Sequence, residues 1–180
     1  MKTYKTEGIV IKRRNLGEAD KILTILTKKL GKLQVKAPGI RRIISRRSPH
    51  VELLNYVSFS LYCGKSLPVV TEAEAIETFS LLKENLGKIS TAYHTCELVD
   101  NFCPDNQENY DIFVLLKNTL LNIERSVDSK NLIKKFELDL LTKLGYIQPI
   151  PMSSNFNTTA FIEQLLEKKL KSRQIAPFLS

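Results

Sequence analysis

The chain has 180 residues, of which 43% are hydrophobic and 26% charged, as is usual for a soluble globular protein of one medium domain or two small ones. No apolar run approaches the roughly 18 residues that a membrane span needs, and Thr6, Glu7 and Gly8 interrupt any signal-peptide core. Three cysteines, an odd number, do not form a disulfide framework. We therefore expect a cytoplasmic protein in a reducing compartment.

The net charge of +8 is distributed unevenly along the chain. Residues 1–47 hold 14 lysines and arginines against three acidic residues, a net charge of +11. Residues 48–80 carry a net charge of −3, and residues 81–180 are neutral. Such asymmetry indicates that the N-terminal part meets an anionic partner, either nucleic acid or an anionic membrane surface.

Five runs in the first 80 residues are typical of β-strands, because they are rich in Ile, Val, Leu and Thr and partly alternate with polar positions. Turn residues such as Gly17, Gly39 and Gly64 separate them. Five short strands predict a small closed Greek-key barrel, with the OB-fold as the leading candidate, although the pattern alone also fits an SH3-like barrel. The predicted strands are residues 8–14, 21–29, 32–37, 55–64 and 67–79.

From about residue 80 the apolar spacing changes to three and four, the helical period. Helices are predicted over 81–102, 108–126, about 128–145 and 158–172, and Gly145 provides a C-terminal signal. The fold class is therefore α+β, with a five-stranded OB-fold at residues 1–80 followed by an α-helical domain at residues 81–180.

Two basic clusters, one at residues 12–14 and one at residues 36–47, dominate the positive region. Either could be a solvated loop, but two clusters with the acidic residues elsewhere favour binding of phosphates, and the arginine fork suits bidentate contacts to phosphate oxygens. Lys28, Lys29 and Lys32 form a possible third cluster. A membrane is the weaker interpretation because no amphipathic helix accompanies the clusters. The predicted nucleic-acid-binding residues are Lys12, Arg13, Arg14, Lys36, Arg41, Arg42, Arg46 and Arg47.

Aromatic side chains in the barrel region decide whether bases stack on the protein. Tyr4, Tyr56, Phe59 and Tyr62 are the candidates. Alternation places Phe59 on the face opposite Tyr56 and Tyr62, so Phe59 is expected in the core. The two tyrosines either stack on bases or pack, and packing is favoured. Because the chain has no Trp, we expect binding dominated by the nucleic-acid backbone.

Catalytic and metal-binding motifs are weak. Cys96 and Cys103 lie near His94, but no CxxC pair exists, and His94 is interpreted as a helix-surface residue. No phosphate-binding GxxxxGK[ST] loop occurs. Glu18 and Asp20 would be candidate Mg²⁺ ligands of a nuclease or nucleotidyl transferase, but local ion pairs explain them better. We predict no enzyme activity, no cofactor and no metal.

Several segments resemble the RecO family of bacterial recombination mediators. The longest is "YKTEGIVIKRRNLGEADKILTILTKKLGKLQVKAPGIRR", Tyr4 to Arg42. "SLPVVTEAEAIETF", "AYHTCELVD" and "KKFELDLLTKLGYIQPI" continue the similarity to about Pro149. The resemblance implies an N-terminal OB-fold, a C-terminal helical domain and binding of single- and double-stranded DNA.

The resemblance also implies functions and partners. These are annealing of complementary strands, association with RecR and with the acidic C-terminal tail of single-stranded DNA-binding protein, and, indirectly, loading of RecA. Localisation would then be nucleoid-associated. Lys130, Lys134 and Lys135 are candidates for holding the acidic tail, with a solvated helix face as the alternative.

Two departures from the family pattern stand out. Many relatives carry a four-cysteine zinc module after the "LGY.P" segment, whereas "IPMSSNFNTTAF" has no cysteine, and the chain looks shorter than typical members. We therefore expect no zinc. The alternative function is an RNA-binding OB-fold protein acting in translation.

Overall fold

The computed structural model describes residues 2–42, 44–126, 129–151 and 155–172. The chain forms two compact units: Met1–Thr78 together with Phe102–Phe113, and Phe79–Asn101 together with Val114–Ser180. The first unit is a β-barrel and the second is helical. The assignment of domains to residues 1–80 and 81–180 stays a prediction, and each unit is described by itself below.

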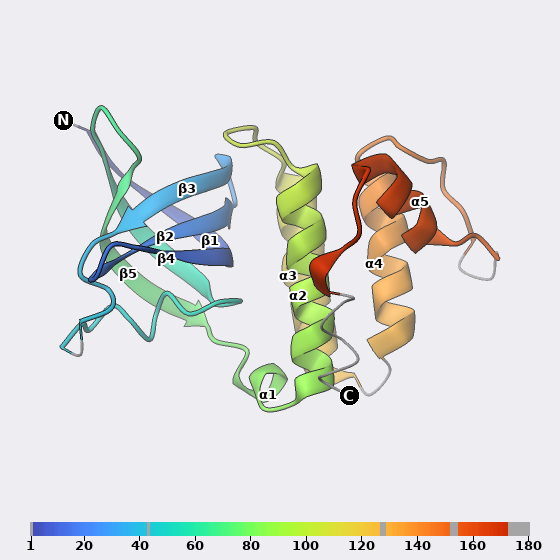
Figure 1. Cartoon of the computed structure of the whole chain (residues 1–180), viewed down its shortest axis with the longest axis horizontal. Helices are drawn as coiled ribbons and strands as arrows, with labels where there is room; N and C mark the ends of the chain where they lie inside the picture. Colours follow the sequence, from blue (N-terminus) through green and yellow to red (C-terminus); the bar gives the residue numbers. More distant parts are fainter. Residues whose placement is uncertain (1, 43, 127–128, 152–154, 173–180) are drawn as a thin grey trace. The chain divides into compact units, whose positions relative to one another are not determined.

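Five strands form a closed barrel in the order β1-β2-β3-β5-β4 (Figure 1). This is the arrangement of a five-stranded OB-fold, so the predicted fold class is confirmed. All neighbours pair antiparallel except β3 and β5, which meet in parallel at the single pair Lys36–Val69. The strands are β1 (Lys2–Leu16), β2 (Asp20–Thr27), β3 (Gly31–Ala37), β4 (Tyr56–Cys63) and β5 (Val69–Glu77).

Strand β1 is long enough to serve two neighbours, pairing with β4 over Lys2–Ile9 and with β2 over Gly8–Leu16. Its register with β2 shifts between Val10 and Lys12. There the Val10 N–H donates to the Asn55 carbonyl at 3.0 Å, and the Leu54 N–H donates to the Val10 carbonyl at 2.8 Å. Because a bulge bends its strand, this site supplies curvature that the closed barrel requires.

The barrel interior is filled by side chains from alternate positions of the strands and from the loop between β3 and β4. Phe59 is fully buried among them, as alternation predicts. Truncating such a residue to alanine typically costs about 3–5 kcal/mol. The cluster consists of Val10, Leu23, Ile25, Leu33, Val35, Ala37, Ile40, Val51, Val57, Phe59, Leu61 and Val70.

The segment after helix α2 (Leu86–Phe102) packs against the start of β3. The Asn106 N–H donates to the Lys32 carbonyl at 2.8 Å, and the Lys32 ammonium lies 3.2 Å from the Asp105 carboxylate. A Cβ added to Gly31, whose φ is +70°, would lie 1.9 Å from the Gln107 carbonyl oxygen. The segment therefore covers an edge of β3 at a position where only glycine fits.

The helical elements are α1 (Ser80–Lys83), α2, α3 (Tyr110–Arg125), α4 (Ser129–Lys143) and α5 (Thr158–Leu166) (Figure 1). The helix predicted over 81–102 is divided in two, because Asn85 caps α2: its Oδ1 accepts the Lys88 N–H at 3.0 Å. Among the described residues, no helix is long and apolar enough to cross a membrane.

The last predicted helix, over 158–172, is shorter in the structure, where α5 ends at Leu166. Glu167 adopts a left-handed conformation with φ 52°, which ends the helix. The chain then packs Leu170 into the core, where it is fully buried. The Glu163 carboxylate accepts the Leu170 N–H at 3.3 Å. This side chain takes the place of the backbone carbonyl that would accept the N–H if the helix continued.

Candidate nucleic-acid interface

Basic side chains of β1 and β3 lie on either side of β2 on the outer face of the sheet. Arg14 pairs with Ile22, which pairs with Lys36, so the three residues share one face of the sheet. That face is the outer one, because the neighbouring residues Leu23 and Val35 lie in the core. Lys12 lies two residues along β1 on the same face, opposite Thr24. We call Lys12, Arg14 and Lys36 the basic row.

Arg13 lies apart from this row. It pairs with Leu23, a core residue, and is therefore directed to the other side of the sheet. Its guanidinium forms an ion pair with Glu52 at 2.8 Å. Burial and the neighbouring Arg13 charge lower the pKa of Lys21, a half-buried residue that sequence reasoning did not select. The only sequence signal for Lys21 was the general excess of cations.

The loop between β3 and β4, residues 38–55, lies against the turn between β1 and β2. The Arg41 N–H donates to the Ala19 carbonyl at 3.0 Å, and its guanidinium donates to the Gly17 carbonyl at 2.9 Å. The basic row ends beside the same turn, since Arg14 lies near the end of β1 and Lys36 near the end of β3. The structure thus brings together the two basic clusters that are separate in sequence.

Arg14, Arg42 and Arg46 are exposed, and their guanidinium groups take part in no ion pair or hydrogen bond with the residues that the structure describes. They are accordingly the cations best placed to meet an external anion. Ile44, between Arg42 and Arg46, is also highly exposed, at 86%. The loop therefore presents charge around one apolar side chain.

Asp20 organises this end of the barrel. Its Oδ1 accepts the Gly39 N–H at 2.9 Å, and its Oδ2 lies 3.0 Å from the Lys36 ammonium. The hydrogen bond from Gly39, together with the Lys36 charge, holds the pKa of Asp20 below its ordinary value. Asp20 thus forms the local ion pair expected for it. In the described part of the chain, no group of three or more His, Cys, Asp or Glu side chains is placed to hold a metal ion.

Arg47 differs from the other arginines of the loop. One terminal nitrogen donates to the Val70 carbonyl at 2.7 Å, and the other donates to the Pro38 carbonyl at 2.8 Å. A longer contact of 3.4 Å joins it to the Thr71 carbonyl. Its guanidinium is therefore engaged by the protein's own backbone.

The third possible cluster lies at the other end of β2 and is largely paired. Lys28 lies 3.3 Å from the Glu7 carboxylate, and Lys32 is buried and paired with Asp105. Only Lys29 is exposed. These three residues do not extend the basic row.

The barrel tyrosines pack or are partly covered. Tyr56 is only 5% exposed, its hydroxyl donates to Glu7, and its ring lies 5.9 Å from that of Phe113. The packing role favoured for Tyr56 is thus confirmed. Tyr4 and Tyr62 are half-buried, and burial together with a hydrogen bond to Cys63 raises the pKa of Tyr4 to about 12.

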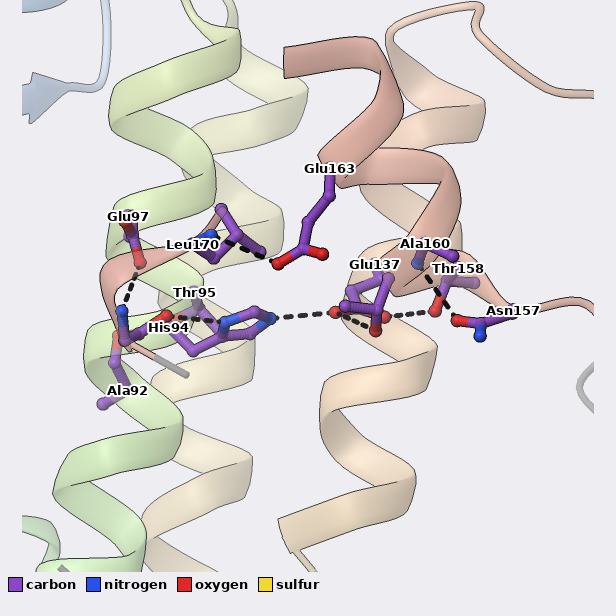
Figure 2. Close-up of polar contacts among 12 residues, drawn as sticks. Ala92, His94, Thr95, Glu97, Glu137, Asn157, Thr158, Ala160, Glu163 and Leu170 are labelled. Atoms are coloured by element: carbon purple, nitrogen blue, oxygen red, sulfur yellow. Dashed lines mark hydrogen bonds and ion pairs between the residues drawn. The ribbon is translucent and has the colours of Figure 1, made fainter. Parts of the chain in front are cut away.

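The helical unit contains a buried polar network (Figure 2). Glu137, 1% exposed, lies 2.8 Å from His94 Nε2 and accepts a hydrogen bond from the Thr158 hydroxyl. His94 is 4% exposed, and its Nδ1 lies 2.9 Å from the Ser172 hydroxyl. The expectation that His94 lies on the helix surface is therefore wrong. Its partner Glu137 is 43 positions away in sequence, beyond the reach of helical periodicity.

The line Ser172–His94–Glu137 has the order of nucleophile, base and carboxylate in hydrolytic triads. Its surroundings do not suit that chemistry. The Ser172 N–H, which would face a developing oxyanion, donates instead to Glu97 at 2.8 Å. The Cys96 thiol, close to His94 in sequence, is also a poor nucleophile, because burial raises its pKa to about 12 and keeps it protonated. The network joins α2, α4 and α5 and the chain after α5.

The lysines predicted to hold an acidic tail lie on α4. Lys135 is exposed and Lys134 is half-buried. The side chain of Lys130 lies outside the described residues. Lys134 and Lys135 precede Glu137 by three and two residues, so α4 carries basic groups close in sequence to its buried carboxylate.

The strand order places the barrel among the OB-folds, a class of small barrels that includes many oligonucleotide- and oligosaccharide-binding modules. Two family models assign the chain more closely. The model described as recombination protein O N terminal matches residues 1–79, and the one described as recombination protein O C terminal matches residues 83–149. The chain belongs to the RecO family.

Curated relatives agree with this assignment. A protein named DNA repair protein RecO from Roseiflexus sp. (strain RS-1) is 38% identical over 147 residues, which cover 81% of this chain and 51% of the relative. The protein of the same name from Symbiobacterium thermophilum is 37% identical, with 81% and 58% covered. That from Acetivibrio thermocellus is 33% identical, with 89% and 64% covered. The chain spans about half the length of the curated relatives it matches.

Proposed function

We propose that the chain is a non-enzymatic DNA-binding mediator of recombination and repair. The observation that carries the proposal is that the loop bearing Arg42 and Arg46 lies against the turn between β1 and β2, which follows the end of β1 two residues beyond Arg14. A guanidinium group can donate two parallel hydrogen bonds to the oxygens of one phosphate. Cations from several elements can together bind successive phosphates of a nucleic-acid backbone. Membership of the RecO family supports DNA as the polymer.

Strand annealing follows from the same charge. Two DNA strands repel each other, and a protein face with excess cations lowers that repulsion and raises the local concentration of both strands. The family resemblance further supports association with RecR and with the acidic tail of single-stranded DNA-binding protein, and so assistance in loading RecA. Lys134 and Lys135 are the described candidates for the tail.

The test is an anisotropy titration of labelled single-stranded DNA over a salt series, with wild type and the Arg14/Arg42/Arg46→Ala variant. Removing three phosphate contacts should reduce the log–log salt slope by about two and lower affinity on the order of 30-fold. The matched control is Lys5/Lys29/Lys65→Ala, which removes three exposed cations elsewhere on the barrel. It should keep most of the wild-type affinity.

Equal affinity of the two variants would refute binding through the arginines. A parallel titration with RNA of the same sequence separates the RNA-binding alternative, because a mediator of repair should not prefer RNA. Annealing is measured by quenching between complementary labelled strands, and the arginine variant should anneal more slowly than the lysine variant. Mg²⁺-dependent cleavage of the DNA would contradict the non-enzymatic assignment.

A further inference from the structure

Arg47 occupies the point where the loop of residues 38–55 leaves β3 and passes β5. Pro38 is the first residue after β3, and Val70 is the second residue of β5. By donating to both carbonyls, at 2.8 Å and 2.7 Å, one guanidinium joins the two strands immediately beside their single backbone pair, Lys36–Val69. Arg47 thus continues the β3–β5 junction by a side chain.

The two ends of a planar fork are needed for this contact. The two terminal nitrogens of Arg47 reach different acceptors at once, whereas a lysine carries its donors on a single nitrogen and has no planar fork to place against both carbonyls. A contact to phosphate is less demanding, since lysine also serves there. The two roles therefore respond differently to replacement by lysine.

The loop on both sides of Arg47 is held in a compact form by backbone hydrogen bonds. The Ser45 N–H donates to the Arg42 carbonyl at 2.9 Å, and the His50 N–H donates to the Arg47 carbonyl at 3.1 Å. His50 accepts the Ala75 N–H at 3.1 Å on its Nδ1, which places the loop along β5. Arg47 lies between this attachment and the exposed Arg42 and Arg46.

We propose that Arg47 is a positioning residue, which fixes the loop to β3 and β5 so that Arg42 and Arg46 are presented to the phosphate backbone, and that it does not itself bind phosphate. This inference rests on the proposed DNA-binding function. It replaces the role predicted for Arg47 from sequence, while leaving those of Arg42 and Arg46 unchanged.

The test compares Arg47→Lys and Arg47→Ala with Arg46→Lys and Arg46→Ala, its exposed neighbour. We expect Arg46→Lys to bind single-stranded DNA within about twofold of wild type, and Arg46→Ala to lose about 0.7 from the salt slope. Arg47→Lys should lose about tenfold in affinity, like Arg47→Ala, because the loop must be ordered on binding. Its salt slope should stay that of wild type, since no phosphate contact is removed.

Amide hydrogen exchange without DNA separates this inference from the proposed function. Exchange at Arg42, Ser45 and His50 should accelerate in Arg47→Lys and not in Arg46→Lys, while β4 amides stay protected in both. If wild type failed to bind DNA, the proposed function would fall, and the exchange would still show whether Arg47 fixes the loop. Wild-type exchange rates in the Arg47→Lys loop, with wild-type affinity, would overturn the positioning role.

Arginine side-chain NMR of the wild-type chain guards against variants that do not fold. The Arg47 guanidinium signals should exchange slowly in the free protein and stay in place when DNA is added, whereas those of Arg46 should shift. Arg47 signals that move with DNA and return at high salt together with those of Arg46 would assign Arg47 to phosphate binding.

Discussion

The basic face of the barrel and the His94–Glu137 network of the helical unit both consist of charged and polar side chains. The two regions differ in whether these groups are solvated by water or hydrogen-bonded within the fold. Arg14, Arg42 and Arg46 are exposed to solvent, where we propose that they bind a phosphate backbone. Glu137 is 1% exposed, and its oxygens are met by His94 and Thr158. Exposed cations cost the fold little and can serve binding, whereas a buried carboxylate requires partners within the fold.

The largest expected effect is on the buried side of this comparison. Glu137→Ala leaves His94 and Thr158 without their acceptor in the core, which should lower the free energy of unfolding by about 3–5 kcal/mol. Urea denaturation followed by circular dichroism at 222 nm measures it. Asp139→Ala is the control, since Asp139 is half-buried on the same helix and its side chain forms no hydrogen bond or ion pair with the described residues. Equal losses in the two variants would assign no stabilising role to the network.

A second contrast lies within the barrel, between a crowded turn and an open one. Gly31→Ala places a Cβ against the Gln107 carbonyl at φ +70°, and should cost about 3 kcal/mol. Gly17→Ala, at φ +59° with nothing within 4 Å, carries only the backbone cost of about 1 kcal/mol. Thermal denaturation of both variants checks the difference. Similar melting points would show that the 105–107 segment yields easily.

A third prediction concerns Glu97, a partly exposed carboxylate between the two extremes. Burial alone would raise its pKa, but hydrogen bonds from Ser172 and Lys171 outweigh this and lower it. A lowered folded-state pKa means that the carboxylate stabilises the attached segment fully above its ordinary pKa of 4.5, and that this is lost as pH falls through the lowered value. Exchange protection of the Lys171 and Ser172 amides should fall accordingly.

The matched variant for that prediction is Glu97→Gln. Its amide side chain keeps one acceptor oxygen but does not titrate, so protection at Lys171 and Ser172 should be lower at neutral pH and nearly independent of pH. A wild-type pH dependence that persists in Glu97→Gln would assign the titration to another group.

The smallest expected effect belongs to the exposed cations. The Arg14/Arg42/Arg46→Ala variant should keep the wild-type free energy of unfolding to within about 0.5 kcal/mol per site, because these exposed guanidinium groups form no ion pair or hydrogen bond with the described residues. Urea denaturation at low and high salt measures it. A loss above about 3 kcal/mol in total would make these arginines part of the barrel's own structure, and the DNA-binding test would then need single variants.

The strands and most of the helices are predictable from sequence because their signals are local. Alternation placed Phe59 in the core, and turn glycines separated the strands. The break between α1 and α2 was missed, since Leu82 and Leu86 continue the helical spacing across Asn85. Asn85 was nevertheless a visible capping residue.

The basic residues of the candidate site can be selected from the sequence, but their arrangement cannot. Charge counting selects Arg14, Arg42, Arg46 and Arg47 alike, and it cannot show that the Arg47 guanidinium donates to backbone carbonyls of β5 and Pro38. Because every residue has a backbone carbonyl, the sequence does not show which carbonyls will accept a side-chain hydrogen bond. In the same way, nothing near His94 in sequence indicates Glu137, because the pair is formed only when α2 and α4 pack together.

The segment that covers β3 has a practical consequence for dividing this protein. Cutting the chain after β5 would remove Asp105 and Asn106, which bind the Lys32 ammonium and carbonyl, and Phe113, which packs on Tyr56. The excised barrel would carry an unpaired strand edge beside newly bared apolar surface, the combination that promotes aggregation. A soluble fragment would have to retain the chain through Phe113, or supply a substitute for that cover.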